Sequence, residues 1–206
     1  MLLVVGGHSR NIGKTSLAAG LIRKFRDRRW VALKITQYGR GPCEHHAGPA
    51  SCECAPEDGA EFALSEEYEA GSTDSGRFLA AGAQRSFWLR VPAGELPRAA
   101  TMVRKILAAG DNVIVESNSI LEVVKPDLYL MLFDFGCEDF KSSSLRYMDR
   151  ADAFVVIDRG INAPLWQGIG EGLWEGRPHF LVNPPRFVTR ELAEFVTERL
   201  APAPAA

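Results

Sequence analysis

The chain has 206 residues, with 24 Lys and Arg against 26 Asp and Glu, a formal net charge of −2 and 46% hydrophobic residues. This composition describes one soluble domain with enough apolar surface for a sizeable core, and it excludes a disordered tail protein. The near-neutral charge offers no whole-chain attraction to nucleic acid or to an anionic membrane, so we expect neither as a partner.

Short apolar runs alternate with segments of helical period along the chain. The predicted strands are Leu2–Val5, Trp30–Ile35, Ser86–Val91, Asn112–Val115, Leu128–Phe133, Ala153–Ile157 and His179–Val182. The predicted helices are Thr15–Arg26, Leu96–Ala109, Ser142–Arg150 and Thr189–Leu200. Because the strands are almost wholly apolar and alternate with helices, the sequence predicts a single α/β domain with a doubly wound, mostly parallel sheet of about seven strands.

Residues 37–74 interrupt this alternation. They are rich in Gly, Pro, Cys, His and Glu, and they predict only a short helix near Ala60–Glu69. A loop of this length in a compact domain is usually functional or disordered. We therefore predict one domain over residues 1–200 with an insertion at about 37–74, and a disordered tail over 201–206. With no apolar run near the roughly 20 residues that a bilayer needs and no basic leader, a cytoplasmic location is expected.

The strongest motif opens the chain. A strand leads into Gly7-His8-Ser9-Arg10-Asn11-Ile12-Gly13-Lys14-Thr15-Ser16 and then into an amphipathic helix, which is the context of a phosphate-binding loop. Backbone amides at a helix N-terminus cradle phosphates, the lysine reaches the β- and γ-phosphates, and the threonine hydroxyl coordinates Mg²⁺. The expected nucleotide-binding residues are Gly7, Asn11, Ile12, Gly13, Lys14, Thr15 and Ser16.

The spacing of this loop departs from the common G-x-x-x-x-G-K-[ST] pattern. His8 takes the place of the first glycine, so the loop is one residue longer. His8 and Arg10 are expected either to face solvent or to point at the phosphates.

A carboxylate for the metal is expected at the end of a buried strand beside the phosphate loop. The run Val113-Ile114-Val115 ends in Glu116, which makes Glu116 the candidate for Mg²⁺ coordination or for polarising an attacking group, with a solvent-facing or capping role as the alternative. Asp134 and Asp158 also follow apolar strands, and capping or turn roles suit them equally well.

Four segments in chain order resemble the molybdopterin-guanine dinucleotide biosynthesis protein B family, a branch of the P-loop proteins. They are Gly13-Lys14-Thr15-Ser16-Leu17, Ala32-Leu33-Lys34-Ile35-Thr36-Gln37, Thr73-Asp74-Ser75-Gly76-Arg77 with Ala81-Gly82-Ala83, and Val113-Ile114-Val115-Glu116. The resemblance implies a P-loop fold, Mg²⁺–GTP binding, a homodimer, and an adaptor role with a molybdenum-cofactor biosynthesis protein. It also implies that Lys34 faces the site, where its ammonium group would suit a phosphate or carboxylate.

Other residues resemble a different branch of the same proteins. The loop from Gly7 to Thr15 has the G-x-x-x-x-x-G-K-T spacing of dethiobiotin synthetase, and Leu181-Val182-Asn183-Pro184 is similar to the strand end whose Asn reads adenine in that group. No Asn/Thr-Lys-x-Asp motif for guanine occurs. The base therefore stays open between GTP and ATP, and Asn183 is either a nucleotide-binding residue or a turn residue.

A cluster of soft ligands lies in the insertion. Cys43, His45, Cys52 and Cys54 form a set of three thiols and one imidazole that suits Zn²⁺, although the spacing is not one of the common zinc patterns. A mobile thiol loop that faces substrate, and no function, are the alternatives. Cys137 follows a strand at the ligand edge and could complete such a site.

These patterns favour a nucleotide- and Mg²⁺-binding P-loop protein. Lys14, Glu116 and Lys34 are the candidate catalytic residues, Thr15 and Glu116 the candidate Mg²⁺ ligands, and slow hydrolysis is expected because no water-positioning Gln or arginine finger can be named. The alternatives are an ATP-dependent ligase or kinase of the dethiobiotin-synthetase type, and a metallochaperone in which nucleotide gates metal at the cysteine loop. Asp74 has no assigned role, since it could simply cap a helix over Arg77–Ala81.

Overall fold

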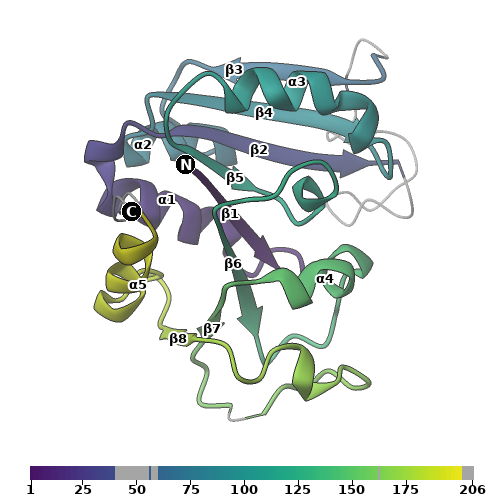
Figure 1. Ribbon diagram of the computed structural model, residues 1–206, viewed down its shortest axis with the longest axis vertical. Coiled ribbons are helices and arrows are strands. Elements are labelled where there is room, and N and C mark those ends of the chain that lie inside the picture. Colours follow the sequence, from purple (N-terminus) through teal and green to yellow (C-terminus); the bar gives the residue numbers. More distant parts are fainter. Residues whose placement is uncertain (40–55, 57–59, 162, 201–206) are drawn as a thin grey trace, which may run out of the picture.

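A computed structural model describes residues 1–39, 56, 60–161 and 163–200. In this part of the chain the strands form one eight-stranded sheet of order β3-β4-β2-β5-β1-β6-β7-β8 (Figure 1). The strands are β1 Leu2–Gly7, β2 Val31–Tyr38, β3 Ala63–Glu67, β4 Arg85–Pro92, β5 Val113–Glu116, β6 Leu128–Asp134, β7 Ala153–Ile157 and β8 His179–Val182. All neighbouring pairs are parallel except β3 with β4.

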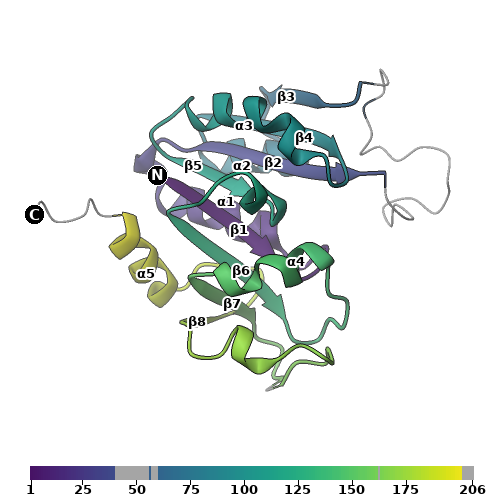
Figure 2. The ribbon, with the colours of Figure 1, turned by 45° about the vertical axis from the view of Figure 1, so that its right-hand side comes forward.

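Helices cover both faces of this sheet. They are α1 Lys14–Lys24, α2 Asp74–Ala81, α3 Ala100–Leu107, α4 Ser142–Tyr147 and α5 Arg190–Leu200. Side chains of α1, α2 and α5 pack in one core and those of α3 and α4 in the other, on opposite sides of the sheet (Figures 1 and 2). The structure therefore confirms the predicted doubly wound α/β fold. None of the helices in the described ranges combines the length and the apolar character needed to cross a bilayer.

The central strands are buried on both faces, which explains their unbroken apolar sequence. On β1, Leu3 and Val5 pack in the core below α1, whereas Val4 packs in the opposite core. The apolar stripe of α1, which includes Leu17 and Leu21, is fully buried against this sheet. Burial of this stripe holds the start of α1 directly behind the end of β1, and that junction is the phosphate loop.

The helix predicted near Ala60–Glu69 is wrong, because this segment contains β3, and β3 raises the predicted count of about seven strands to eight. It pairs antiparallel with β4, so that Ala63 lies opposite Arg90 and Glu67 opposite Ser86. Hydrogen bonds to the open edge of β4 satisfy its backbone and outweigh a weak local preference for helix.

The start of α2 also differs from the expectation. Thr73 caps the helix, since its hydroxyl accepts a hydrogen bond of 3.0 Å from the amide of Gly76. Asp74 is the first helical residue instead of the cap, and its carboxylate is directed elsewhere. The predicted long helix over Leu96–Ala109 is a 3₁₀ turn, Leu96–Ala99, followed by α3.

Candidate functional site

The phosphate loop connects the carboxyl end of β1 to the first turn of α1. Gly7 ends β1 and Lys14 begins α1, with Gly13 in the left-handed region at φ 101° and Asn11 at φ 52°. Ile12 is buried and Asn11 is exposed. The amides of the first turn have no partners inside the helix, so they are available to an anion. The predicted loop residues are thus brought together around the N-terminus of α1.

Asn118, two residues beyond β5, anchors the start of the loop. The amide of Gly7 donates to Asn118 Oδ1 at 2.8 Å, and Asn118 Nδ2 donates to the carbonyl of Gly7 at 2.9 Å. The Ser144 hydroxyl donates to the same carbonyl at 2.7 Å, and the Tyr129 hydroxyl donates to Asn118 Oδ1 at 3.2 Å. A Cβ added at Gly6 would lie 2.2 Å from Asn118 Oδ1, so this clamp needs glycine there. The clamp fixes the position of the loop relative to the sheet.

The expectation that His8 faces solvent or phosphate is wrong. Its ring is fully buried, with ring centroids 5.0 Å from Phe140 and 4.9 Å from Trp166. Burial lowers the pKa of His8, and Nδ1 accepts from the amide of Asp134 while Nε2 lies 3.3 Å from the carbonyl of Cys137. This pattern assigns a neutral ring with its proton on Nε2. His8 therefore anchors the longer loop in an aromatic pocket.

Residues 135–141, which join β6 to α4, hold the outer part of the loop. The Ser9 hydroxyl donates to Asp139 Oδ2 at 2.6 Å. The amide of Lys141 donates to the carbonyl of His8 at 2.8 Å. These contacts bring a second lysine to the phosphate loop from a segment more than a hundred residues away in the sequence.

Below the loop, four side chains form one connected network. The Thr15 hydroxyl donates to Glu116 Oε2 at 2.7 Å, and Lys34 Nζ lies 2.7 Å from Glu116 Oε1 and 2.5 Å from Asp74 Oδ2. Lys34 and Glu116 are register partners on adjacent parallel strands, β2 and β5, which places their side chains on the same face. The predicted pair Thr15 and Glu116 and the predicted Lys34 are thus in direct contact.

Asp74 and Arg77 extend this network along α2. Arg77 Nη2 donates to the hydroxyl of Ser16 at 2.8 Å, and its Nη1 lies 3.7 Å from Asp74 Oδ1. Helix α2 therefore touches both the network below the loop and the first turn of α1. This geometry gives Asp74 a partner, Lys34, in place of the capping role.

Charge in the site is balanced by close pairing. Burial opposes the charge of Lys34, but the carboxylates of Glu116 and Asp74 outweigh it and raise its pKa. Burial lowers the pKa of Lys14, whose ammonium donates to the carbonyl of Ser9 at 2.7 Å. Lys14 therefore bonds back to its own loop. When a phosphate is bound, the ammonium group can exchange the carbonyl of Ser9 for a phosphate oxygen as its hydrogen-bond acceptor.

Lys141 adds a cation that the sequence analysis did not identify. Burial, and then repulsion from Lys14, Arg10 and Lys34, lowers its pKa to about 7, against a smaller attraction from Asp139. Lys141 thus lies near three other cationic groups, of which Lys34 is paired with Glu116 and Asp74. An anion of high charge, such as a polyphosphate, is the ligand that would relieve their mutual repulsion.

The oxygen donors below the loop fit Mg²⁺. A threonine hydroxyl and a carboxylate are hard ligands, and Mg²⁺ in nucleotide sites typically takes one or two protein ligands and completes its shell with water and phosphate oxygens. Thr15 and Glu116 would hold the ion, and the ion would neutralise charge on the phosphates. Glu116 is 3% exposed, so its position is set by the strand and by its partners instead of by solvent.

The turn after β8 lies against the loop. A Cβ added at Gly13 would meet the ring of Phe187 at 2.5 Å, so this ring covers the glycine. Asn183 directly follows β8, and its carbonyl accepts from the amide of Arg186 at 2.8 Å, so it lies in a turn. Its role in reading adenine stays a prediction.

The remaining candidates are placed as follows. Asp158 Oδ1 accepts from the amide of Gly160 at 2.9 Å, which is a turn contact, and Asp134 binds Arg159 with a shortest distance of 2.7 Å. The proposed zinc ligands lie outside the described residues; they are Cys43, His45, Cys52 and Cys54. Within the described ranges, no group of three His, Cys, Asp or Glu side chains is placed to hold a metal ion.

The sequence analysis did not predict three residues of the site, which are Asn118, Lys141 and Phe187. Asn118 carries a usable signal, since it is a polar residue just beyond a buried strand next to the expected carboxylate. Lys141 and Phe187 carry no such signal, because they are single residues in loops. Only the fold brings Lys141 to His8 and Phe187 to Gly13.

The fold and the loop define the class: the chain has the P-loop NTPase fold, with the phosphate loop after a central parallel strand and an acidic strand end beside it. No protein-family model and no curated protein matches the sequence. Among solved structures, it is similar to HypB from Helicobacter pylori in complex with nickel, at 16% identity and a TM-score of 0.46, covering 96% of this chain and 84% of that one. It is also similar to LpxK from Aquifex aeolicus in complex with ATP, at 15% identity and a TM-score of 0.45, covering 87% of this chain and 53% of that one.

Proposed function

We propose that this protein binds a Mg²⁺–nucleotide at the phosphate loop. The observation that carries the proposal is the 2.7 Å contact between the Thr15 hydroxyl and Glu116 Oε2. It joins the residue after the loop lysine to a buried carboxylate on an adjacent strand, which is the arrangement that holds Mg²⁺ beneath β- and γ-phosphates. Lys14 and the amides of the first turn of α1 would bind the phosphates themselves.

Slow turnover is part of the proposal. Each oxygen of Glu116 accepts one hydrogen bond, from Thr15 or from Lys34, and keeps a further lone pair that suits a metal ion. We therefore assign Glu116 to metal binding and to orientation of Lys34. Since the sequence analysis names no water-positioning Gln and no arginine finger, we expect weak hydrolysis without a second substrate or partner.

The finer role proposed here follows the family resemblance. The protein would act as a homodimeric, GTP-binding adaptor for a molybdenum-cofactor biosynthesis protein. The support is the chain order of the resembling segments, three of which supply Lys14, Lys34 and Glu116. In the structure Glu116 contacts Lys34 and also Thr15, the residue after Lys14.

A second candidate function is an ATP-dependent ligase or kinase. The observation that favours it is the position of Lys34, whose side chain is 19% exposed while its ammonium stays fixed between two carboxylates. A fixed cation that solvent still reaches can orient an acidic substrate beside a nucleotide. The metallochaperone alternative depends on the cysteine loop, and metal affinity that changes with bound nucleotide is its test.

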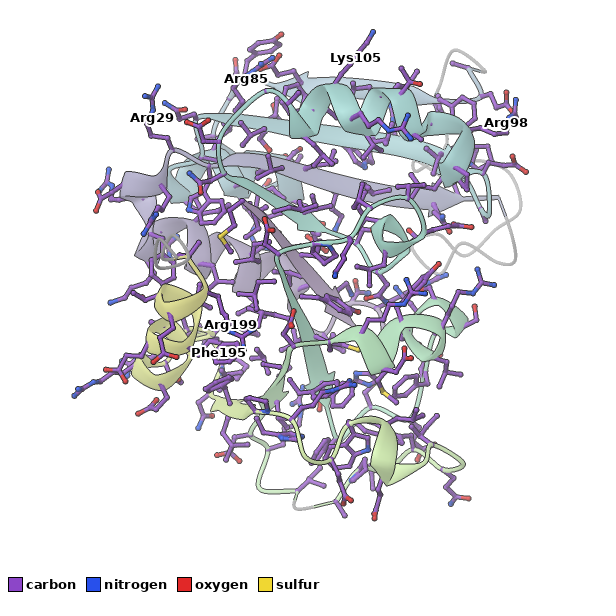
Figure 3. All side chains as sticks on the ribbon, viewed as in Figure 1. Arg29, Arg85, Arg98, Lys105, Phe195 and Arg199 are labelled. Atoms are coloured by element: carbon purple, nitrogen blue, oxygen red, sulfur yellow. The ribbon has the colours of Figure 1, made fainter. Side chains whose placement is uncertain are left out.

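The experiment is calorimetric titration of the protein with Mg²⁺–GTP and Mg²⁺–ATP, with Lys14→Ala as the test variant. Lys105→Ala is the matched control, because Lys105 lies on α3 and points away from the sheet (Figure 3). Lys14→Ala is expected to lose nucleotide affinity and Lys105→Ala to keep it. Preference for GTP supports the adaptor role and preference for ATP the enzyme. Unchanged affinity in folded Lys14→Ala refutes the site.

A further inference from the structure

The carboxyl-terminal half of β4 presents Trp88 and Arg90 beside the site. The two residues are two positions apart, so they share a face of the sheet. Trp88 is the register partner of Lys34, and Arg90 that of Thr36, on β2. They therefore lie on the same face as the Lys34 ammonium, one strand further from the phosphate loop.

Within the described residues, helix α2 meets β4 before the strand reaches Trp88 and Arg90. The helix begins level with Lys34, and the carbonyl of its second residue, Ser75, accepts a hydrogen bond of 2.9 Å from Ser86 on β4. From there α2 runs toward the start of β4. Trp88 and Arg90 lie beyond the helix and are partly exposed.

The two side chains form a preorganised unit. Trp88 Nε1 donates to Thr36 Oγ1 at 2.9 Å, which fixes the indole ring on the sheet. The Arg90 guanidinium carbon lies 4.5 Å from the centroid of that ring. A guanidinium stacked on an indole keeps its plane, which suits recognition of a carboxylate or phosphate by its terminal N–H groups.

Among the described residues, Arg90 has no anionic partner. Its Nε is buried without a hydrogen-bond partner, and within the described residues no carboxylate pairs with it. By contrast, two arginines that pack with the opposite face of the sheet each bind a carboxylate. Arg85 binds Glu66, and Arg98 binds Glu61 (Figure 3). A buried donor without an acceptor costs stability. The terminal nitrogens of the same guanidinium are not among the buried unpaired atoms, and they are the groups that an anion would meet.

We propose that the Trp88–Arg90 stack binds the carboxylate or phosphate group of a small second ligand whose other end reaches Lys34. This inference rests on the proposed function, because it makes the stack the second-ligand subsite of a nucleotide site. Two residues along a strand and one strand across put the Cα atoms of Lys34 and Arg90 roughly 8 Å apart. That span suits a small organic anion, which would lie at the same edge of the sheet as the nucleotide.

The test measures oxyanion binding while the phosphate loop is filled. The protein is saturated with Mg²⁺ and a non-hydrolysable nucleotide and then titrated calorimetrically with inorganic phosphate or with malonate. Arg90→Gln is expected to weaken binding of the preferred probe by about tenfold or more, and Arg90→Lys to weaken it less, because the charge stays and the fork is lost. Arg85→Gln, on the same strand but away from the site, is the matched control and should bind like the wild type.

The outcomes separate the two proposals. Tighter binding of phosphate identifies a phosphate ester as the ligand class, and tighter binding of malonate identifies a carboxylic acid. Equal binding by wild type and Arg90→Gln, or no binding by wild type up to about 20 mM of either probe, overturns this inference even if nucleotide binds. Failure of nucleotide to bind refutes the proposed function, and an Arg90-dependent response to phosphate in the nucleotide-free protein would then still uphold the anion subsite.

Discussion

The Lys141→Met substitution is expected to stabilise the ligand-free protein and to weaken its affinity for nucleotide. Burial, together with repulsion from Lys14, Arg10 and Lys34, holds the pKa of Lys141 at about 7, and Asp139 opposes this only in part. Methionine keeps an unbranched apolar side chain of similar length and removes the charge. The variant therefore separates the cost of burying the cation from its use in binding phosphate.

The magnitude follows from the pKa of Lys141 in the two states. The pKa falls from 10.5 to about 7 on folding. At about 1.4 kcal/mol per pH unit, this shift destabilises the folded protein by roughly 5 kcal/mol at neutral pH, and by about half of that once solvent screening is allowed for. Because the folded pKa is the lower one, the unfolded chain binds the proton more readily. Wild-type stability should therefore rise with pH between about 7 and 10.5, and the destabilisation is complete below about 7.

The assay is urea unfolding at pH 7 and pH 9, with Lys105→Met on the exposed face of α3 as control. The gain for Lys141→Met should be larger at pH 7. Calorimetry should show wild-type nucleotide affinity falling above pH 7, since Lys141 must take up a proton to face the phosphates. This pH slope should be smaller in the variant, where Lys14 is the remaining buried lysine of the loop with a lowered pKa. A variant no more stable than wild type that keeps the same pH slope would refute the reasoning.

Three further substitutions test the site. Asn118→Ala should lower the free energy of unfolding by about 2–3 kcal/mol, because it leaves buried backbone groups of the loop unpaired, whereas Asn112→Ala, at an exposed hydrogen bond, should cost less in the same urea titration. Gly13→Ala should abolish nucleotide binding, because Gly13 has a positive φ and the new Cβ would lie 2.5 Å from the ring of Phe187. Gly39→Ala is the control, since Gly39 also has a positive φ but lies in open space, and it should bind nucleotide like the wild type in calorimetry. Lys34→Met should cost about 3 kcal/mol in urea unfolding, because it strands a buried carboxylate, and a thermal melt as stable as wild type would contradict that ion pair.

Some features of this protein follow from local sequence. The phosphate loop was predictable because a strand, a glycine-flanked turn and an amphipathic helix are each encoded within a few residues of Lys14. Glu116 was predictable for a similar reason, since a charged residue that ends an apolar strand must lie at the sheet edge. The doubly wound fold followed from strands that are apolar on both faces.

Other features depend on which elements become neighbours. Ala63–Glu67 is a strand because it pairs with the edge of β4. His8 is buried because aromatic residues from other segments surround it. Lys141 gains a cationic environment only because its loop bonds to the loop after β1. Helix period and strand alternation report contacts within one element, whereas these contacts join residues that are distant in sequence, and their energy comes from burial and pairing that exist only once the chain has folded.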